Sequence, residues 1–185
     1  MSNGLHTLIA RIDEAVRLGD AAAITQRIKI ELQEAIKTGG LTLPAQFRRI
    51  RPEGYARRLV HRNSEFGYTV VAMAWGPGQS TPLHDHAGIW CVEGVLEGQM
   101  DVTRFDLVEE TSDGYRFEAK DRVRASVGTA GCLIPPFEYH ILANALDTLS
   151  VTLHFYGGEM TMCHAFEPAG NGRYVRYERL LSYQD

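Results

Sequence analysis

Short apolar runs separated by turn residues fill the chain from about residue 55 onward, and this pattern restricts the fold more than any other feature. We expect strands over residues 68–75, 95–105, 123–127, 140–144, 149–156 and 174–181. Turns are expected at residues 76–78, 112–114, 128–131 and 157–158, where glycine recurs. Runs of this length, broken this often, are typical of antiparallel sandwiches and barrels. The sequence therefore predicts a small all-β barrel or jelly roll over residues 51–185.

Residues 1–50 have a helical pattern instead. Apolar residues of the segment 5–18 recur on one helical face, and Gly19 can end that helix. Asp20 is a good N-cap for a second helix, whose apolar residues recur every four positions until a glycine pair stops it. A short third helix is expected over residues 44–47. We expect the helices to pack outside the barrel, because neither part alone would bury its apolar surface.

Length and charge limit the possible functions. A chain of 185 residues suits one well-buried core, so we expect a single domain over residues 1–185. A net charge of −4 argues against a nucleic-acid partner. No apolar run is long enough to cross a bilayer, so we expect no membrane association. Arginines cluster over residues 48–62, and we interpret most of them as a solvated entry to the barrel.

Cysteine usage bears on the cellular compartment. The three cysteines, Cys91, Cys132 and Cys163, are an odd number without close pairing, which fits a reducing environment better than a disulfide framework. The first residues lack the pattern of a secretory signal. We therefore expect a cytoplasmic protein, and the sequence indicates nothing about its oligomeric state.

The segment His84-Asp-His86, with His140 far behind it, is the best candidate for chemistry. Residues at i and i+2 of an extended chain point to the same side, so both imidazoles can reach one metal ion. His140 can supply a third ligand. Three neutral imidazoles leave other positions on a six-coordinate ion open and favour an anionic ligand such as a thiolate. Iron(II) and zinc are both compatible with such a site, and a His-x-His pair alone is more often structural.

The spacing of these residues resembles a known superfamily. Gly78, the His84-x-His86 pair and Gly98 resemble the first cupin motif, and Pro135 with His140-x-x-x-Asn144 resembles the second. The resemblance implies an all-β cupin barrel that holds a transition metal. Cys91 stands nearest the place where many cupins have a carboxylate ligand. We therefore interpret Glu93 as a residue behind the ligands.

Residues 55–166 also resemble the cysteine dioxygenase family of thiol dioxygenases. The resemblance implies Fe(II) bound by His84, His86 and His140. It implies that Tyr55 and Arg57 contact the substrate, with Arg57 paired to the substrate carboxylate. It further implies catalytic roles for Tyr156, for His154 as the residue that orients or polarises Tyr156, and for Cys91, which in the animal enzymes forms a thioether with the tyrosine.

The implied reaction adds dioxygen to L-cysteine and gives cysteine sulfinic acid. Related 3-mercaptopropionate dioxygenases resemble the chain too, but they have glutamine in the place of Arg57, so Arg57 favours cysteine. Mercaptosuccinate is another thiol acid to consider, and a non-catalytic metal-binding cupin is an alternative of a different class. Two departures from the family concern the pocket: Thr152 replaces a serine, and Gly157-Gly158-Glu159 replaces Ser-Pro-Pro.

Overall fold

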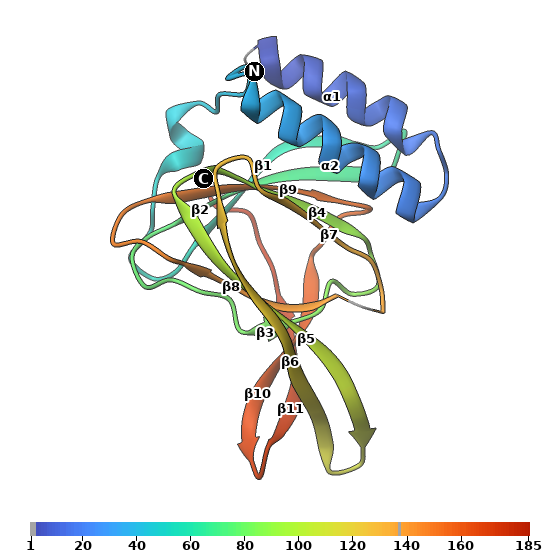
Figure 1. Cartoon of the computed structure of the whole chain (residues 1–185), viewed down its shortest axis with the longest axis vertical. Coiled ribbons are helices and arrows are strands. Elements are labelled where there is room, and N and C mark those ends of the chain that lie inside the picture. Colours follow the sequence, from blue (N-terminus) through green and yellow to red (C-terminus); the bar gives the residue numbers. More distant parts are fainter. Residues whose placement is uncertain (1–2, 137) are drawn as a thin grey trace.

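The structure is a computed structural model that describes residues 3–136 and 138–185. Over these residues the chain forms two α-helices, a short 3-10 helix and eleven β-strands (Figure 1). The helices are α1 (Asn3–Val16), α2 (Ala21–Lys37) and η1 (Ala45–Arg48). The strands are β1 (Ala56–Asn63), β2 (Tyr68–Trp75), β3 (Leu83–His84), β4 (Cys91–Glu97), β5 (Gln99–Thr111), β6 (Gly114–Ser126), β7 (Ala130–Leu133), β8 (Tyr139–Asn144), β9 (Ser150–Tyr156), β10 (Met162–Gly170) and β11 (Arg173–Leu180).

Local sequence signals set the ends of the two long helices. The Asp20 carboxylate accepts a hydrogen bond from the Ala23 amide at 2.8 Å, so Asp20 is the predicted N-cap of α2. Gly19 follows α1 with a φ of +79°, which glycine adopts without strain. The first helix is confirmed but ends two residues earlier than predicted, because a turn precedes Gly19.

The strands form two antiparallel sheets. One has the order β1-β2-β9-β4-β7, and the other has the order β10-β11-β6-β5-β8-β3 and closes on itself where β3 pairs with β10. Helices α1 and α2 lie across the outer face of the five-stranded sheet (Figure 1). The predicted all-β barrel with helices packed outside is therefore confirmed.

Strand alternation gives the five-stranded sheet two different faces. The side chains of this sheet that pack against the helices are those of Tyr68, Val70, Ala72, Val92, Leu153 and Phe155. The side chains that point into the barrel include those of Val71, Met73, Trp75, Cys91, Val95 and Tyr156. The odd-numbered residues of β4 and the even-numbered residues of β9 therefore line the interior.

The prediction of one strand over residues 95–105 is wrong. Strand β4 ends at Glu97 and β5 begins at Gln99, and the two belong to different sheets. Gly98 between them has a φ of +75°, and a Cβ atom there would lie 2.2 Å from Ser150 Oγ. A turn that requires glycine thus carries the chain from one sheet to the other.

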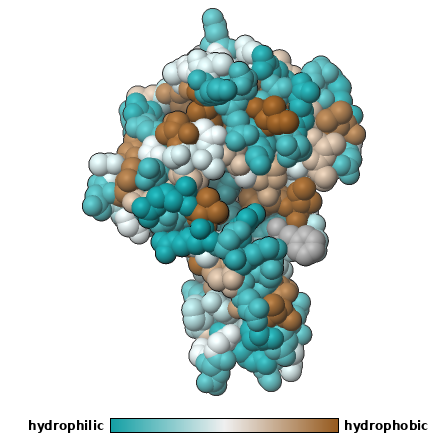
Figure 2. Space-filling model, viewed as in Figure 1, coloured by the Kyte–Doolittle hydropathy of each residue, from teal (hydrophilic) through white to brown (hydrophobic). Residues whose placement is uncertain are grey.

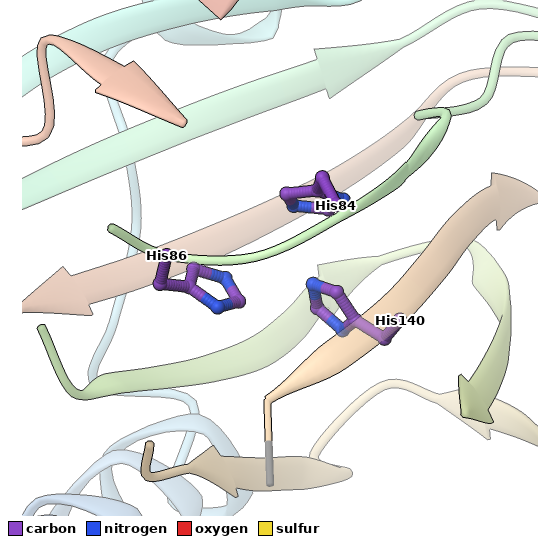
Figure 3. Close-up of side chains that lie close together, drawn as sticks. All are labelled: His84, His86 and His140. Carbon is purple, nitrogen blue, oxygen red and sulfur yellow. The ribbon is translucent and has the colours of Figure 1, made fainter. Parts of the chain in front are cut away.

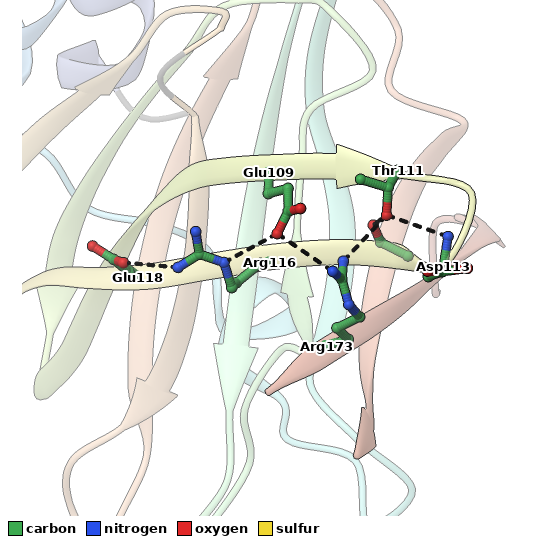
Figure 4. A network of polar contacts seen from close by, with 7 residues as sticks. Glu109, Thr111, Asp113, Arg116, Glu118 and Arg173 are labelled. Carbon is green, nitrogen blue, oxygen red and sulfur yellow. Dashed lines mark hydrogen bonds and ion pairs between the residues drawn. The ribbon is translucent and has the colours of Figure 1, made fainter. Parts of the chain in front are cut away.

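Two long hairpins, β5–β6 and β10–β11, extend away from the helices (Figure 1). In the space-filling view they form a narrow, largely hydrophilic extension (Figure 2). Aromatic residues fill the space between them, with the rings of Phe117 and Phe166 4.8 Å apart at their centroids. At the surface Arg173 donates to Thr111 at 3.2 Å and lies 3.5 Å from Glu109 (Figure 4). Because exposed ion pairs stabilise little, the aromatic contacts hold the hairpins together.

Candidate metal centre

Three histidines from two distant parts of the chain converge inside the barrel (Figure 3). The ring centroids of His84, His86 and His140 lie between 4.7 and 5.2 Å apart. Their candidate ligand nitrogens all lie within 4.8 Å of one another, and all three side chains are buried. The structure thus brings together the three residues that the sequence predicts as metal ligands.

A short strand and a fixed loop bring the three rings together. His84 on β3 is the antiparallel partner of His140 on β8. Strand β3 ends at His84, so His86 lies just beyond it in the following loop, and both rings still face the same point, as their spacing predicts. Asp85 holds the loop, since its carboxylate accepts hydrogen bonds from the His164 amide at 2.8 Å and the Ala87 amide at 3.1 Å. The same carboxylate lies 2.8 Å from His164 Nδ1.

The protonation state of the rings suits metal binding. Burial lowers the pKa of His84 to about 3 and lowers the pKa of His140 well below its usual value. The neighbouring imidazoles lower both pKa values further. These rings are therefore neutral at physiological pH, and the neutral imidazole is the form that binds a metal ion.

Buried carboxylates lie behind two of the rings. Glu138 is 3.7 Å from His86 Nδ1, and Glu93 is 3.6 Å from His140 Nδ1. Outer carboxylates of this kind orient metal-binding histidines and leave the Nε2 atom for the metal. Among the described residues, His140 Nε2 has no hydrogen-bond partner, although it is buried. An unpaired buried nitrogen facing two other imidazoles fits a transition metal ion.

His84 completes the same pattern with a backbone group. Its Nδ1 lies 3.1 Å from the carbonyl oxygen of Pro82. This contact fixes the ring and again leaves Nε2 for the metal centre. His84 is thus fixed by a hydrogen bond, whereas the Nδ1 atoms of His86 and His140 have a carboxylate 3.6 to 3.7 Å away but no hydrogen-bond partner among the described residues.

The predicted catalytic residues of β9 form a buried polar row. The Trp75 indole donates a hydrogen bond to Thr152 Oγ1 at 2.9 Å, and Thr152 Oγ1 lies 2.7 Å from His154 Nε2. His154 Nδ1 lies 3.5 Å from Glu93. Tyr156 stacks on His154, with 5.9 Å between ring centroids and 13° between ring planes. No hydrogen bond joins the two rings within the described chain, so any influence of His154 on Tyr156 passes through ring contact.

A small cavity joins the histidines to the predicted substrate residues. Its lining includes Tyr55, Arg57, Met73, Thr81, His84, His86, Glu93, His140, Leu142, His154, Tyr156, Met160, Cys163, Arg179 and Leu181. Only about 20 Å³ is open to the centres of water molecules, so a substrate must displace water and contact the walls directly. A larger cavity of about 340 Å³ shares Glu93 and His140 but does not include the other two histidines. The small cavity is therefore the candidate site.

Arg57 is held rigidly at the wall of this cavity. Its side chain is 4% exposed and donates hydrogen bonds to the carbonyl oxygens of Met160 at 3.2 Å and Ser182 at 3.5 Å. Tyr55 stacks on Trp75, with 4.4 Å between ring centroids. Both residues that the sequence predicts for substrate binding thus line the cavity of the three histidines.

A family model for cysteine dioxygenase type I matches residues 4–169. This chain belongs to that family. Cysteine dioxygenase type 1 of Rattus norvegicus is 28% identical over 115 residues, which cover 61% of this chain and 56% of that protein. The match to the rat protein therefore spans little more than half of its length. The Bos taurus protein is 24% identical over 147 residues, which cover 77% of this chain and 72% of that protein.

The chain is also similar in structure to an uncharacterized conserved protein with a double-stranded β-helix domain from Klebsiella pneumoniae. The TM-score is 0.49 at 14% identity, and the similarity covers 75% of this chain and 97% of that chain. Membership of the cysteine dioxygenase family, together with the two antiparallel sheets, assigns the cupin fold that the sequence predicts. None of the helices in the described residues is long and apolar enough to cross a membrane.

The two residues for which the sequence predicts a thioether are neighbours in the structure. Cys91 on β4 and Tyr156 on β9 are direct antiparallel partners. Both side chains are buried, and burial raises the pKa of the Cys91 thiol and of the Tyr156 hydroxyl. The register therefore allows a bond between them, because directly opposed side chains in an antiparallel pair lie close together.

Sequence reasoning missed two residues near the three histidines, Glu138 and Arg179. Glu138 is two positions before His140, so alternation could have placed both on one face. Glu93 lies behind the ligands as predicted from the motif, and burial raises its pKa to about 8. Arg179 had no local signal, because it reaches the cavity only through the pairing of β10 with β11, where it is opposite Cys163.

Proposed function

We propose that the protein is a non-haem iron(II) dioxygenase that adds both atoms of dioxygen to the sulfur of a small thiol acid. L-Cysteine, which would give cysteine sulfinic acid, is the first substrate to test. One observation carries the proposal: three buried imidazoles converge in a cavity that Arg57 and Tyr156 also line. Iron(II) held by His84, His86 and His140 would supply the redox centre at which thiolate and dioxygen react.

The chain's own residues provide binding and orientation. Arg57 presents a planar guanidinium that can pair with the substrate carboxylate through two parallel hydrogen bonds. Tyr156 can donate a hydrogen bond from its hydroxyl to a negatively charged oxygen of the bound reactants. The small cavity excludes bulk water, which strengthens these contacts.

The reaction is balanced without a further reductant. The thiol loses its proton to form the thiolate, and two sulfur–oxygen bonds form as the oxygen–oxygen bond breaks. The sulfur supplies all the electrons that the two oxygen atoms take up. This balance fits a site in which three histidines would hold a single metal ion.

A combined metal and substrate assay tests the proposal. Protein loaded anaerobically with iron is mixed with L-cysteine, 3-mercaptopropionate and mercaptosuccinate in turn, and oxygen uptake and sulfinate are measured. We expect one oxygen molecule consumed per sulfinate formed with at least one thiol. Tightly bound metal without oxygen uptake for any thiol would instead support a non-catalytic metal-binding cupin.

A matched pair of variants tests the role of Arg57. We expect Arg57→Met to lower kcat/KM for thiol acids about 10- to 150-fold, the value of a charge-assisted hydrogen bond. Arg58→Met is the control, because Arg58 is also buried and donates to the carbonyl oxygens of Arg49 and Asp185, but it does not line the cavity. Equal losses of kcat/KM in both variants would show that Arg57 acts only through stability.

A further inference from the structure

The cavity of the metal centre contains a second arginine that the family resemblance does not supply. Arg179 on β11 lines it together with Arg57 on β1. The guanidinium carbon of Arg179 lies 5.6 Å from the centroid of the Tyr55 ring. Arg57 lies 5.4 Å from the centroid of the Tyr183 ring, so the two cations approach the cavity from different strands and against different rings.

Neither arginine has an acidic partner. Within residues 3–136 and 138–185, no carboxylate forms an ion pair with Arg57 or Arg179. Other arginines near the barrel are paired; Asp101, for example, accepts hydrogen bonds from Arg122 and Arg124. Arg57 is buried with only carbonyl oxygens as hydrogen-bond acceptors, and Arg179 is half-buried, so the cavity offers an incoming anion two guanidinium groups that no carboxylate of the described residues neutralises.

The two arginines reach different parts of the site. Both act electrostatically on Tyr55 and Cys163, which are their shared neighbours. Arg57 is on β1 of the five-stranded sheet, and Arg179 is on β11 of the closed sheet. The positive charge therefore reaches the cavity from both sheets.

We propose that the preferred substrate is a thiol with two carboxylates, one bound by Arg57 and the other by Arg179, with its sulfur directed to the three histidines. The inference rests on the proposed function, because it names the substrate class of the same site. The oxidation of the thiol to the sulfinate is unchanged. A thiol with one carboxylate leaves one of the two guanidinium groups without an anion, and this difference creates the preference.

Steady-state kinetics with a variant of Arg179 test the proposal. The substrates are mercaptosuccinate, with two carboxylates, and 3-mercaptopropionate, with one. We expect the wild type to prefer mercaptosuccinate in kcat/KM by about 10- to 150-fold, the factor that one charge-assisted hydrogen bond supplies. Arg179→Gln should lower kcat/KM for mercaptosuccinate by the same factor. The same variant should change kcat/KM for 3-mercaptopropionate by no more than about threefold.

Two control variants separate charge from structure. Arg179→Lys keeps the positive charge, so it should retain part of the preference for mercaptosuccinate over 3-mercaptopropionate. Arg176→Gln changes an arginine on the same strand that stacks on Tyr115 outside the cavity, and it should leave both substrates unaffected. Equal loss for the two substrates in Arg179→Gln would overturn the proposal, as would a wild type that prefers the monocarboxylate.

A binding measurement tests the dicarboxylate inference independently of the proposed dioxygenase activity. Succinate carries two carboxylates and no thiol, so it reports on the arginines without any oxygen chemistry. We expect succinate to raise the melting temperature of the zinc-loaded protein more than propionate does, and Arg179→Gln to abolish the difference. If no thiol is oxidised but succinate still stabilises through Arg179, the dioxygenase proposal fails while the binding of a dicarboxylate stands. If succinate and propionate act equally, the dicarboxylate inference fails.

Discussion

Removing the hydroxyl of Thr152 tests the polar row behind the metal centre. Thr152 Oγ1 lies 2.9 Å from the Trp75 indole nitrogen and 2.7 Å from His154 Nε2, and all three side chains are at most 3% exposed. An indole N–H can only donate, so the hydroxyl oxygen accepts that bond, and the same hydroxyl forms the hydrogen bond with His154 Nε2. The other ring nitrogen of His154, Nδ1, lies on the side of Glu93.

The magnitude follows from the two partners that lose their bond. Thr152→Val keeps the shape of the side chain but leaves a buried indole N–H and a buried imidazole nitrogen without a partner. Each unsatisfied group costs about 1 to 3 kcal/mol, so we expect a loss of about 2 to 6 kcal/mol in the free energy of unfolding. Thr152→Ser keeps the hydroxyl and removes one methyl group, which costs about 1 kcal/mol.

Urea denaturation of the metal-free protein measures both variants without the contribution of metal binding. We expect the free energy of unfolding to be highest for the wild type, lower for Thr152→Ser and lowest for Thr152→Val, although valine is the more apolar residue at this buried position. A valine variant as stable as the serine variant would refute the reasoning. The nitrogen chemical shifts of His154 provide a second measurement, because the valine variant removes the bond that fixes its tautomer.

Three further predictions concern the loop, the cysteine and the surface. Asp85→Ala should weaken metal affinity about 10- to 100-fold in a competition titration, as loss of an outer-shell partner does, whereas Asp106→Ala at an exposed site should not. Iron-loaded protein that has turned over a thiol should have a mass lower by two hydrogens from a Cys91–Tyr156 thioether; a fully alkylatable Cys91 would contradict this. Hydrogen bonds from two arginines lower the pKa of Asp101, so its stabilising contribution is present above the unfolded-state pKa and is lost as pH falls through the folded-state pKa. The stability difference between wild type and Asp101→Asn, followed by urea midpoints, should therefore shrink in acid; a difference independent of pH would disprove it.

Features with a local physical cause could be predicted from the sequence. The N-cap at Asp20 and the glycine end at Gly19 depend on neighbouring residues, and both are confirmed. The convergence of His84 and His86 also depends on local spacing, although His86 lies in the loop after β3 and not in the strand itself. The strand over residues 68–75 was predicted with its correct limits, because turn residues follow it directly.

Features with a nonlocal cause could not be predicted. Strand β6 begins at Gly114, whereas the sequence predicts a strand only over residues 123–127. The outer half of that strand alternates Tyr115 and Phe117 with Arg116 and Glu118, so a period-two signal is present there, but the sequence does not indicate its long pairing with β5. Arg179 enters the cavity through the register of β10 and β11, and register depends on the whole sheet rather than on a motif.

Under the proposed function, the division of the site between two sheets would let one metal centre serve different thiols. His84 and His140 come from the closed sheet, whereas Glu93 and His154 come from the five-stranded sheet that faces it. Arg57 is on β1, the edge strand of the five-stranded sheet, and is not a neighbour of the ligands in the chain. A substitution on such a strand can change the anion-binding wall without moving the imidazoles, because His84 and His140 are placed by the pairing of β3 with β8, and His86 is placed by the loop that Asp85 holds. The charge pattern of the wall should therefore be a better guide to the substrate than the ligand set.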